Sequence, residues 1–144
     1  MEKIKNSKVV AKVINEDKAL LITTDEDTPD YYGISIVKAN KATKQKLINY
    51  EHVLTKKETF LNMLKDMYYA KAAFEEKILY IPCKCYSEIL RVWYMPRDAY
   101  SPEMFFFDIF DNHFLKCPKG IQDNIYLSCG KLKDLCEQLD LSLV

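Results

Sequence analysis

Glycine is scarce in this chain: only Gly33, Gly120 and Gly130 occur among its 144 residues. Loops that cradle phosphate groups need glycine, because only glycine lets the backbone approach an anion closely. Three isolated glycines therefore exclude the glycine-rich nucleotide-binding motifs. No kinase, hydrolase-elbow or coenzyme A pyrophosphate-binding pattern occurs either. The sequence thus favours a protein that is not an enzyme.

Arginine is nearly missing as well, since all but Arg91 and Arg97 of the 21 basic residues are lysine. Arginine is the preferred side chain for bidentate contacts with phosphates and bases. Basic and acidic residues also balance at 21 each, which gives zero net charge. Both features argue against a dedicated binder of nucleic acid or of an anionic membrane. The excess of lysine over arginine fits a low-GC genome, such as that of a bacterium or its phage.

Long apolar runs are missing too. No segment approaches the roughly 18–20 continuous apolar residues of a membrane span, and the first residues contain no apolar stretch of signal-peptide length. The five cysteines are an odd number in a chain of single-domain size. A domain of this length buries about 68–70% of its unfolded surface and needs no disulfide. We therefore expect one cytoplasmic domain, residues 1–144, with reduced thiols.

The first third of the chain predicts strands. Residues 9–14 and 20–24 are rich in β-branched side chains and are separated by a short polar turn, which indicates an antiparallel hairpin. A third strand is expected over residues 31–37. The side chains that share one face of it are Tyr32, Ile34 and Ile36. Residues 47–54 fit either a strand or a short helix.

Two segments predict helices. Apolar residues recur at a spacing of three and four over residues 56–74, so one face of a helix there would be apolar. Thr55 is expected to cap this helix, with Glu58 completing a capping box. A shorter helix is expected over residues 130–139, with Ser128 as its cap.

Four further strands are expected over residues 78–81, 88–95, 104–110 and 125–127. For residues 104–110 a helix that starts at residues 101–103 is the alternative. Residues 78–81 predict a buried strand. Residues 88–95 are apolar on both faces, which is typical of a central strand or of a strand with one face covered by a partner. The turns between strands are too short for crossover helices. The sequence therefore predicts an α+β fold, with a mostly antiparallel β-sheet covered on one face by one long helix and one short C-terminal helix.

Residues 78–115 hold ten of the eighteen aromatic side chains, including the only tryptophan. Most of these rings must fill the core. Trp93, Tyr94, Arg97 and Tyr100, however, are residue types enriched at binding hot spots, and the last two lie in a predicted loop between prolines. We expect this surface to bind a protein partner, as in an inhibitor, immunity or adaptor protein. A homodimer formed through the aromatic face is an alternative.

A metal site is a rival hypothesis. Cys83, Cys85, His113 and Cys117 could surround zinc tetrahedrally, either in a structural domain or in a metal-dependent enzyme. The Cys-x-Cys spacing is tighter than that of common zinc motifs. Buried cysteines that pack as small apolar side chains are the simpler interpretation.

Charge is unevenly distributed along the chain. Residues 16–30 carry a net charge of −5, and residues 38–57 a net charge of +5. The lysines between Lys38 and Lys57 could bind nucleic acid, with Tyr50 available for stacking on a base. The two segments could instead attract a complementary protein surface, or be ordinary solvated loops.

Overall fold

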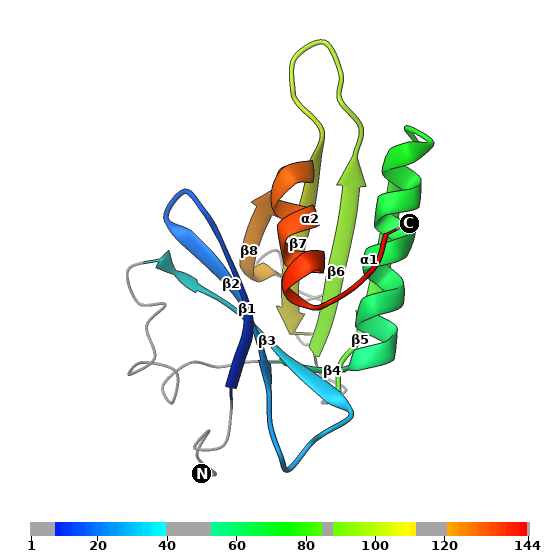
Figure 1. The fold of residues 1–144 in the computed structure, drawn as a ribbon. Helices are drawn as coiled ribbons and strands as arrows, with labels where there is room; N and C mark the ends of the chain where they lie inside the picture. Colours follow the sequence, from blue (N-terminus) through cyan, green and yellow to red (C-terminus); the bar gives the residue numbers. More distant parts are fainter. Residues whose placement is uncertain (1–7, 40–52, 85–87, 112–120, 144) are drawn as a thin grey trace.

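The computed structural model describes residues 8–39, 53–84, 88–111 and 121–143 (Figure 1). These residues form two antiparallel four-stranded sheets and two α-helices. Sheet A consists of β1 (Lys8–Asn15), β2 (Lys18–Thr24), β3 (Tyr31–Lys38) and β4 (Val53–Lys56). Sheet B consists of β5 (Lys77–Pro82), β6 (Glu88–Met95), β7 (Met104–Asp111) and β8 (Ile121–Leu127). The helices are α1 (Lys57–Ala72) and α2 (Cys129–Gln138).

Both sheets are simple meanders in which each strand pairs with the next one along the chain. The expected hairpin is β1–β2, which turns at Glu16 and Asp17. The strand expected over residues 31–37 is β3, and its predicted face is confirmed, because Tyr32, Ile34 and Ile36 all lie in the core. Strand β6 is central in sheet B, between β5 and β7. Residues 53–56 form a strand, which takes in the last two residues of the ambiguous segment 47–54 and the two that follow it; residues 47–52 lie outside the described residues.

The second helix begins as the sequence predicts. Ser128 is its N-cap, and the hydroxyl of Ser128 accepts a hydrogen bond from the Lys131 amide at 3.3 Å. The capping box predicted for α1 is wrong. Thr55 pairs with Tyr32 in the ladder between β4 and β3, so it belongs to sheet A. The first amide of α1, that of Lys57, donates instead to the Asp30 carbonyl at 2.9 Å.

Both helices lie on the same face of sheet B (Figure 1), where α1 contacts β5 and β6 and α2 contacts β7 and β8. Sheet A meets sheet B along β8, which contacts β1, β2 and β3. The core is therefore enclosed by both helices and one face of each sheet. The fully buried members of the core include Leu20, Ile22 and Ile34 from sheet A, and Leu90, Val92, Tyr94, Phe105, Phe107, Phe60, Leu64, Met67, Leu132 and Leu135 from sheet B and the helices.

The fold is α+β, as the sequence predicts, although the strands divide into two sheets. The prediction of a buried strand over residues 78–81 is only partly right. Ile81 is 4% exposed, but Ile78 is 41% and Tyr80 61% exposed. Strand β5 is at an edge of sheet B, and the helices cover only one of its faces, so alternate side chains face solvent. No helix in the described ranges is long and apolar enough to cross a membrane.

Candidate functional site

The face of sheet B that points away from the helices is rich in aromatic rings. Trp93 on β6 pairs with Phe106 on β7, and their ring centroids are 5.7 Å apart. Phe106 in turn lies 6.0 Å from the ring of Tyr126 on β8. Strand alternation explains this row, because the neighbours of these residues in sequence point into the core. Three adjacent strands thus present contiguous rings on one face.

An ion pair lies beside this row. Arg91 Nε donates to Asp108 Oδ2 at 2.8 Å, directly across the β6–β7 ladder. The guanidinium carbon also lies 4.8 Å from the ring centroid of Phe110 and 5.7 Å from that of Trp93. Burial opposes the charged form of Arg91, but the contact with Asp108 and a hydrogen bond with Tyr80 raise the pKa of Arg91 above its ordinary value. The cation therefore compensates the nearly buried carboxylate and packs against rings.

Trp93 is only partly exposed. Its indole Nε1 donates to Glu76 Oε2 at 2.8 Å, which ties β6 to the segment that precedes β5. With Phe106 on one side and this hydrogen bond at the ring edge, the indole is held in one orientation. Trp93 is therefore a rigid element at the base of the β6–β7 connection.

Tyr94 is fully buried, so its predicted place on the surface is wrong. Its ring packs 4.9 Å from that of Phe105, on the face of sheet B that the helices cover. Its hydroxyl donates to Glu103 Oε2 at 3.0 Å. Because Glu103 immediately precedes β7, Tyr94 anchors one end of the connection between β6 and β7 to the core. Burial, followed by the contact with Glu103, raises the pKa of Tyr94 to about 12.

Residues 96–103 connect β6 to β7 and form the β6–β7 loop. It projects beyond the ends of both strands, at the top of the molecule in Figure 1. Asp98 organises its tip, because one carboxylate oxygen accepts the amides of Tyr100 and Ser101, each at 2.8 Å. The Asp98 amide donates back to the Ser101 carbonyl at 3.0 Å. Short-range bonds of this kind give a loop one defined backbone conformation.

Tyr100 is 96% exposed at the tip of this loop, and Arg97 is exposed near its start. The four predicted partner-binding residues are thus brought to one end of sheet B but differ in role. Arg97 and Tyr100 are accessible, Trp93 is a partly buried support, and Tyr94 is an internal anchor.

The proposed zinc ligands lie mostly outside the described ranges. Only Cys83 falls within them; it is buried, and its Sγ lies 3.9 Å from the carbonyl oxygen of Ile81. Cys85, His113 and Cys117 fall outside. Within residues 8–39, 53–84, 88–111 and 121–143 no three metal-ligating side chains cluster. Zinc binding stays a prediction.

The lysine-rich segment is likewise described only at its ends, at Lys38, Lys56 and Lys57. Nucleic-acid binding by that segment also stays a prediction.

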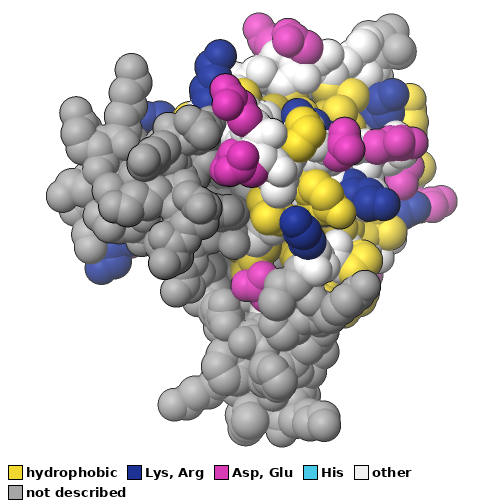
Figure 2. All heavy atoms as spheres, turned by 90° about the horizontal axis from the view of Figure 1, so that it is seen from below, with side chains coloured by type: hydrophobic (Ala, Val, Ile, Leu, Met, Phe, Trp, Pro, Cys, Tyr) yellow, Lys and Arg dark blue, Asp and Glu magenta, His cyan; other side chains and the backbone are white. Residues whose placement is uncertain are grey.

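Figure 2 shows the molecule from below, relative to the view of Figure 1. On the coloured part of this face, acidic and basic side chains alternate around hydrophobic ones.

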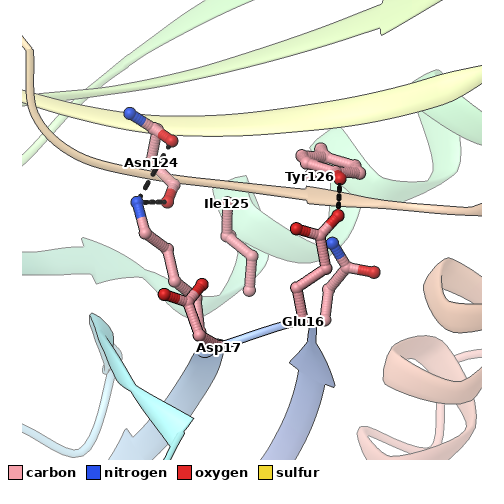
Figure 3. A pocket seen from close by; sticks show the side chains of 7 residues that line it. Glu16, Asp17, Asn124, Ile125 and Tyr126 are labelled. Carbon is pink, nitrogen blue, oxygen red and sulfur yellow. Dashed lines mark hydrogen bonds between the residues drawn. The ribbon is translucent and has the colours of Figure 1, made fainter.

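A small cleft of about 190 Å³ lies between the β1–β2 turn and β8 (Figure 3). Lys18 Nζ donates to the Asn124 carbonyl at 2.9 Å, and the Tyr126 hydroxyl donates to Glu16. The bond to Glu16 raises the pKa of Tyr126 above its ordinary value. These hydrogen bonds pair the polar atoms of the cleft with one another across the junction of the two sheets. The residues that line the cleft therefore connect sheet A to sheet B.

A larger open groove, of about 410 Å³, lies between the start of β1, the start of α1 and the end of α2. Lys57 Nζ lies 5.5 Å from the ring centroid of Tyr32 there. Burial and then the charge of Asp140 raise the pKa of the Tyr32 phenol.

Several apolar side chains are exposed at positions that were not predicted to be on the surface. Phe74 is 74% exposed directly after α1, and Tyr69 is 56% exposed on that helix. Ile78 and Tyr80 stand on the outer face of β5. Their i, i+2 spacing is the one signal that could have identified them, because alternate residues of an edge strand share a face.

No known protein family matches this chain, and no curated protein matches it in sequence.

Proposed function

We propose that this protein acts, without chemistry of its own, by binding a protein partner through the β6–β7 loop. One observation carries the proposal: Tyr100, 96% exposed, stands on a loop whose backbone is organised by Asp98. An exposed tyrosine on an ordered, projecting loop contributes little to the stability of the fold. It does have the properties of an interface anchor.

The order of the loop lowers the entropic cost of binding. Fixing a mobile segment on association costs free energy for every residue that becomes ordered. Here the Asp98 hydrogen bonds hold the tip, and the bond from Tyr94 to Glu103 holds the base. The tyrosine ring also has few rotatable bonds, so it gains contact area at small further cost. Arg97 can add a bidentate contact with a carboxylate beside it.

The convex shape of the loop indicates a concave partner site. A loop that projects beyond its sheet can enter a cleft, whereas a flat adaptor surface would present a broad strand or helix face. Among the three expected roles, this shape favours an inhibitor or immunity protein over an adaptor. A cytoplasmic location and a bacterial or phage origin belong to the same proposal.

The test begins with capture of the partner from native cells by the tagged chain, followed by measurement of its affinity for purified variants. Tyr100→Ala should weaken binding by roughly 30-fold, the effect of removing a hot-spot side chain worth about 2 kcal/mol. Arg97→Ala should weaken it by a smaller factor. Tyr69→Ala is the matched control, because it removes an exposed tyrosine from α1 and should leave the affinity unchanged.

Asp98 provides a test of the order of the loop. Asp98→Ala removes the acceptor for two amides and should weaken partner binding while leaving the thermal unfolding temperature in place. Asp98→Asn keeps a side-chain oxygen in the same position and should restore most of the affinity. Two outcomes would exclude the loop as the binding site. One is full affinity for the partner in both Tyr100→Ala and Arg97→Ala, and the other is equal capture of the partner by these variants and the wild type.

A further inference from the structure

Among the described residues, β5 is a sheet edge without a partner strand on its outer side, whereas each of the other three edges makes at least one hydrogen bond. On β1, the Gln138 side chain makes two hydrogen bonds with the Lys12 backbone. On β4, the Leu54 carbonyl accepts the Lys84 amide at 2.7 Å. On β8, the Asn124 carbonyl accepts Lys18 Nζ. Within β5 itself, no described residue donates to or accepts from its outer edge; the Lys84 amide that bonds to β4 points to the same side two residues beyond the end of β5.

The register of β5 and β6 shows which backbone groups point outward. The Cys83 amide donates to the Glu88 carbonyl at 3.3 Å, in the same register that pairs Ile81 with Leu90. Successive residues in an antiparallel strand alternate between bonding to the neighbouring strand and pointing away from it, so residues two apart point to the same side. The odd-numbered residues of β5 therefore bond to β6. The amides and carbonyls of Ile78 and Tyr80 point to the open edge.

The side chains of these same two residues are exposed. Ile78 is 41% and Tyr80 61% exposed on the outer face of sheet B. An edge that combines free backbone groups with exposed apolar side chains is a template for strand pairing. Natural edges avoid this with proline, lysine or cover. Here Lys77 stands at the start of β5 and Pro82, which lacks an amide, at its end, so neither device lies at the residues between them.

We infer that β5 pairs antiparallel with β5 of a second copy of this chain, centred on Leu79, to give one eight-stranded sheet across a two-fold axis. In this register Ile78 lies opposite Tyr80 of the second copy, and the two residues exchange both backbone hydrogen bonds. The symmetry repeats the exchange with Tyr80 and Ile78 reversed. Each pair also places an aliphatic side chain against an aromatic one on the outer face, a stabilising cross-strand combination.

Charge favours a second copy as the occupant of this edge. Glu75 and Glu76 precede β5, and Lys84 follows it; all three are exposed. Antiparallel pairing brings the acidic end of one β5 close to the basic end of the other, at both ends of the interface. A two-fold axis perpendicular to the sheet also requires paired residues to be an even number apart, which the pairing of residues 78 and 80 satisfies.

The first measurement is the molar mass in solution over a wide range of protein concentration. The wild type should rise with concentration from 16.9 kDa toward twice that mass. Ile78→Lys and Tyr80→Lys each put a lysine on the edge strand, the charged residue that prevents pairing at natural sheet edges. Each should raise the dissociation constant of the dimer at least about tenfold. Tyr100→Lys is the matched control on the β6–β7 loop and should dimerise like the wild type. Circular dichroism checks that all variants remain folded.

The second measurement tests the register by oxidative cross-linking. In a pairing centred on Leu79, the two copies of that residue form a pair without mutual hydrogen bonds, with Cα atoms about 4.5 Å apart, within disulfide range. Leu79→Cys should therefore cross-link, above the background that the five native cysteines give in the wild type. The two copies of residue 80 are more than about 7 Å apart, so Tyr80→Cys should not cross-link.

Three results would overturn the inference. One is a wild type that stays at 16.9 kDa at every concentration. Another is a dimer that Ile78→Lys and Tyr80→Lys leave intact, which would place the interface elsewhere. The third is cross-linking by Tyr80→Cys in place of Leu79→Cys, which would show a different register.

Discussion

Gln138 and Lys12, which lie 126 residues apart in sequence, exchange two hydrogen bonds. The Lys12 amide donates to Gln138 Oε1 at 2.8 Å, and Gln138 Nε2 donates to the Lys12 carbonyl at 3.0 Å. A side-chain amide has the same kinds of donor and acceptor as a peptide unit. The Gln138 side chain therefore makes the two hydrogen bonds with Lys12 that a neighbouring strand would make at the edge of β1. This contact couples the last helix to the first strand and covers an edge that would otherwise be open.

Replacing Gln138 should therefore destabilise the fold. Gln138→Leu removes both bonds, and we expect the free energy of unfolding to fall by about 1–2 kcal/mol, with a lower urea midpoint and an unchanged slope. Glu137→Ala, at the neighbouring exposed position of α2, is the control and should change stability by less than about 0.5 kcal/mol. Equal stability of the two variants would show that the paired bonds contribute nothing.

Both helices end in a Schellman motif without glycine. Phe74 (φ 55°) follows α1, with the Glu75 amide donating to the Ala70 carbonyl; Asp140 (φ 57°) follows α2, with the Leu141 amide donating to the Cys136 carbonyl. A left-handed conformation costs a residue with a Cβ roughly 1–2 kcal/mol. Aspartate tolerates it better than a bulky aromatic residue does.

Phe74→Gly should thus increase stability. Part of the relieved strain is offset by the larger entropy of glycine in the unfolded chain, so we expect a net gain of about 0.5–1 kcal/mol. Asp140→Gly should give a smaller gain. Thermal or urea unfolding of the two variants side by side provides the measurement. A loss of stability in Phe74→Gly would mean that its ring, although 74% exposed, contributes packing that outweighs the strain.

Thr55 carries a buried hydroxyl with no hydrogen-bond partner among the described residues. Burying an unpaired hydroxyl costs free energy, and valine has the same shape without this group. Thr55→Val should raise the free energy of unfolding by about 1 kcal/mol. Thr55→Ser retains the hydroxyl and loses the methyl group, so it should lower stability. A destabilised Thr55→Val variant would indicate that the hydroxyl has a partner after all.

Stability should fall in alkaline solution. Burial raises the pKa of Tyr94 from 10.0 to about 12 and that of Cys136 from 9.0 to about 11. Both groups are thus neutral in the folded state over a range where the unfolded chain ionises. Their contribution to the free energy of unfolding is complete below pH 9.0 and is lost as the pH rises through about 11 to 12.

Urea midpoints measured from about pH 8 to about pH 11 would detect this loss. Tyr94→Phe removes one of the two groups and should flatten the decline. Tyr69→Phe, a change at an exposed tyrosine, should leave it as in the wild type. A decline that is the same with and without the Tyr94 hydroxyl would show that other groups cause it.

The candidate site was only partly predictable. The prolines and Asp98 mark an exposed loop, and Arg97 and Tyr100 are indeed accessible on it. Strand alternation also places Trp93 and Tyr94 on opposite faces of β6, but alternation alone does not say which face is covered. The helices cover the Tyr94 face, so the residue predicted as a contact became the anchor of the loop.

The order and type of the described helices and strands, β4 excepted, followed from the chain itself, because β-branched runs, three-and-four apolar spacing and the Ser128 cap act within a few residues. Only the tertiary structure decided that the strands form two sheets, that Thr55 belongs to a strand, and that β5 alone keeps an open edge among those described. These outcomes depend on contacts between residues far apart in sequence. Gln138 is the clearest case, since nothing near it in the chain indicates that its amide will meet Lys12.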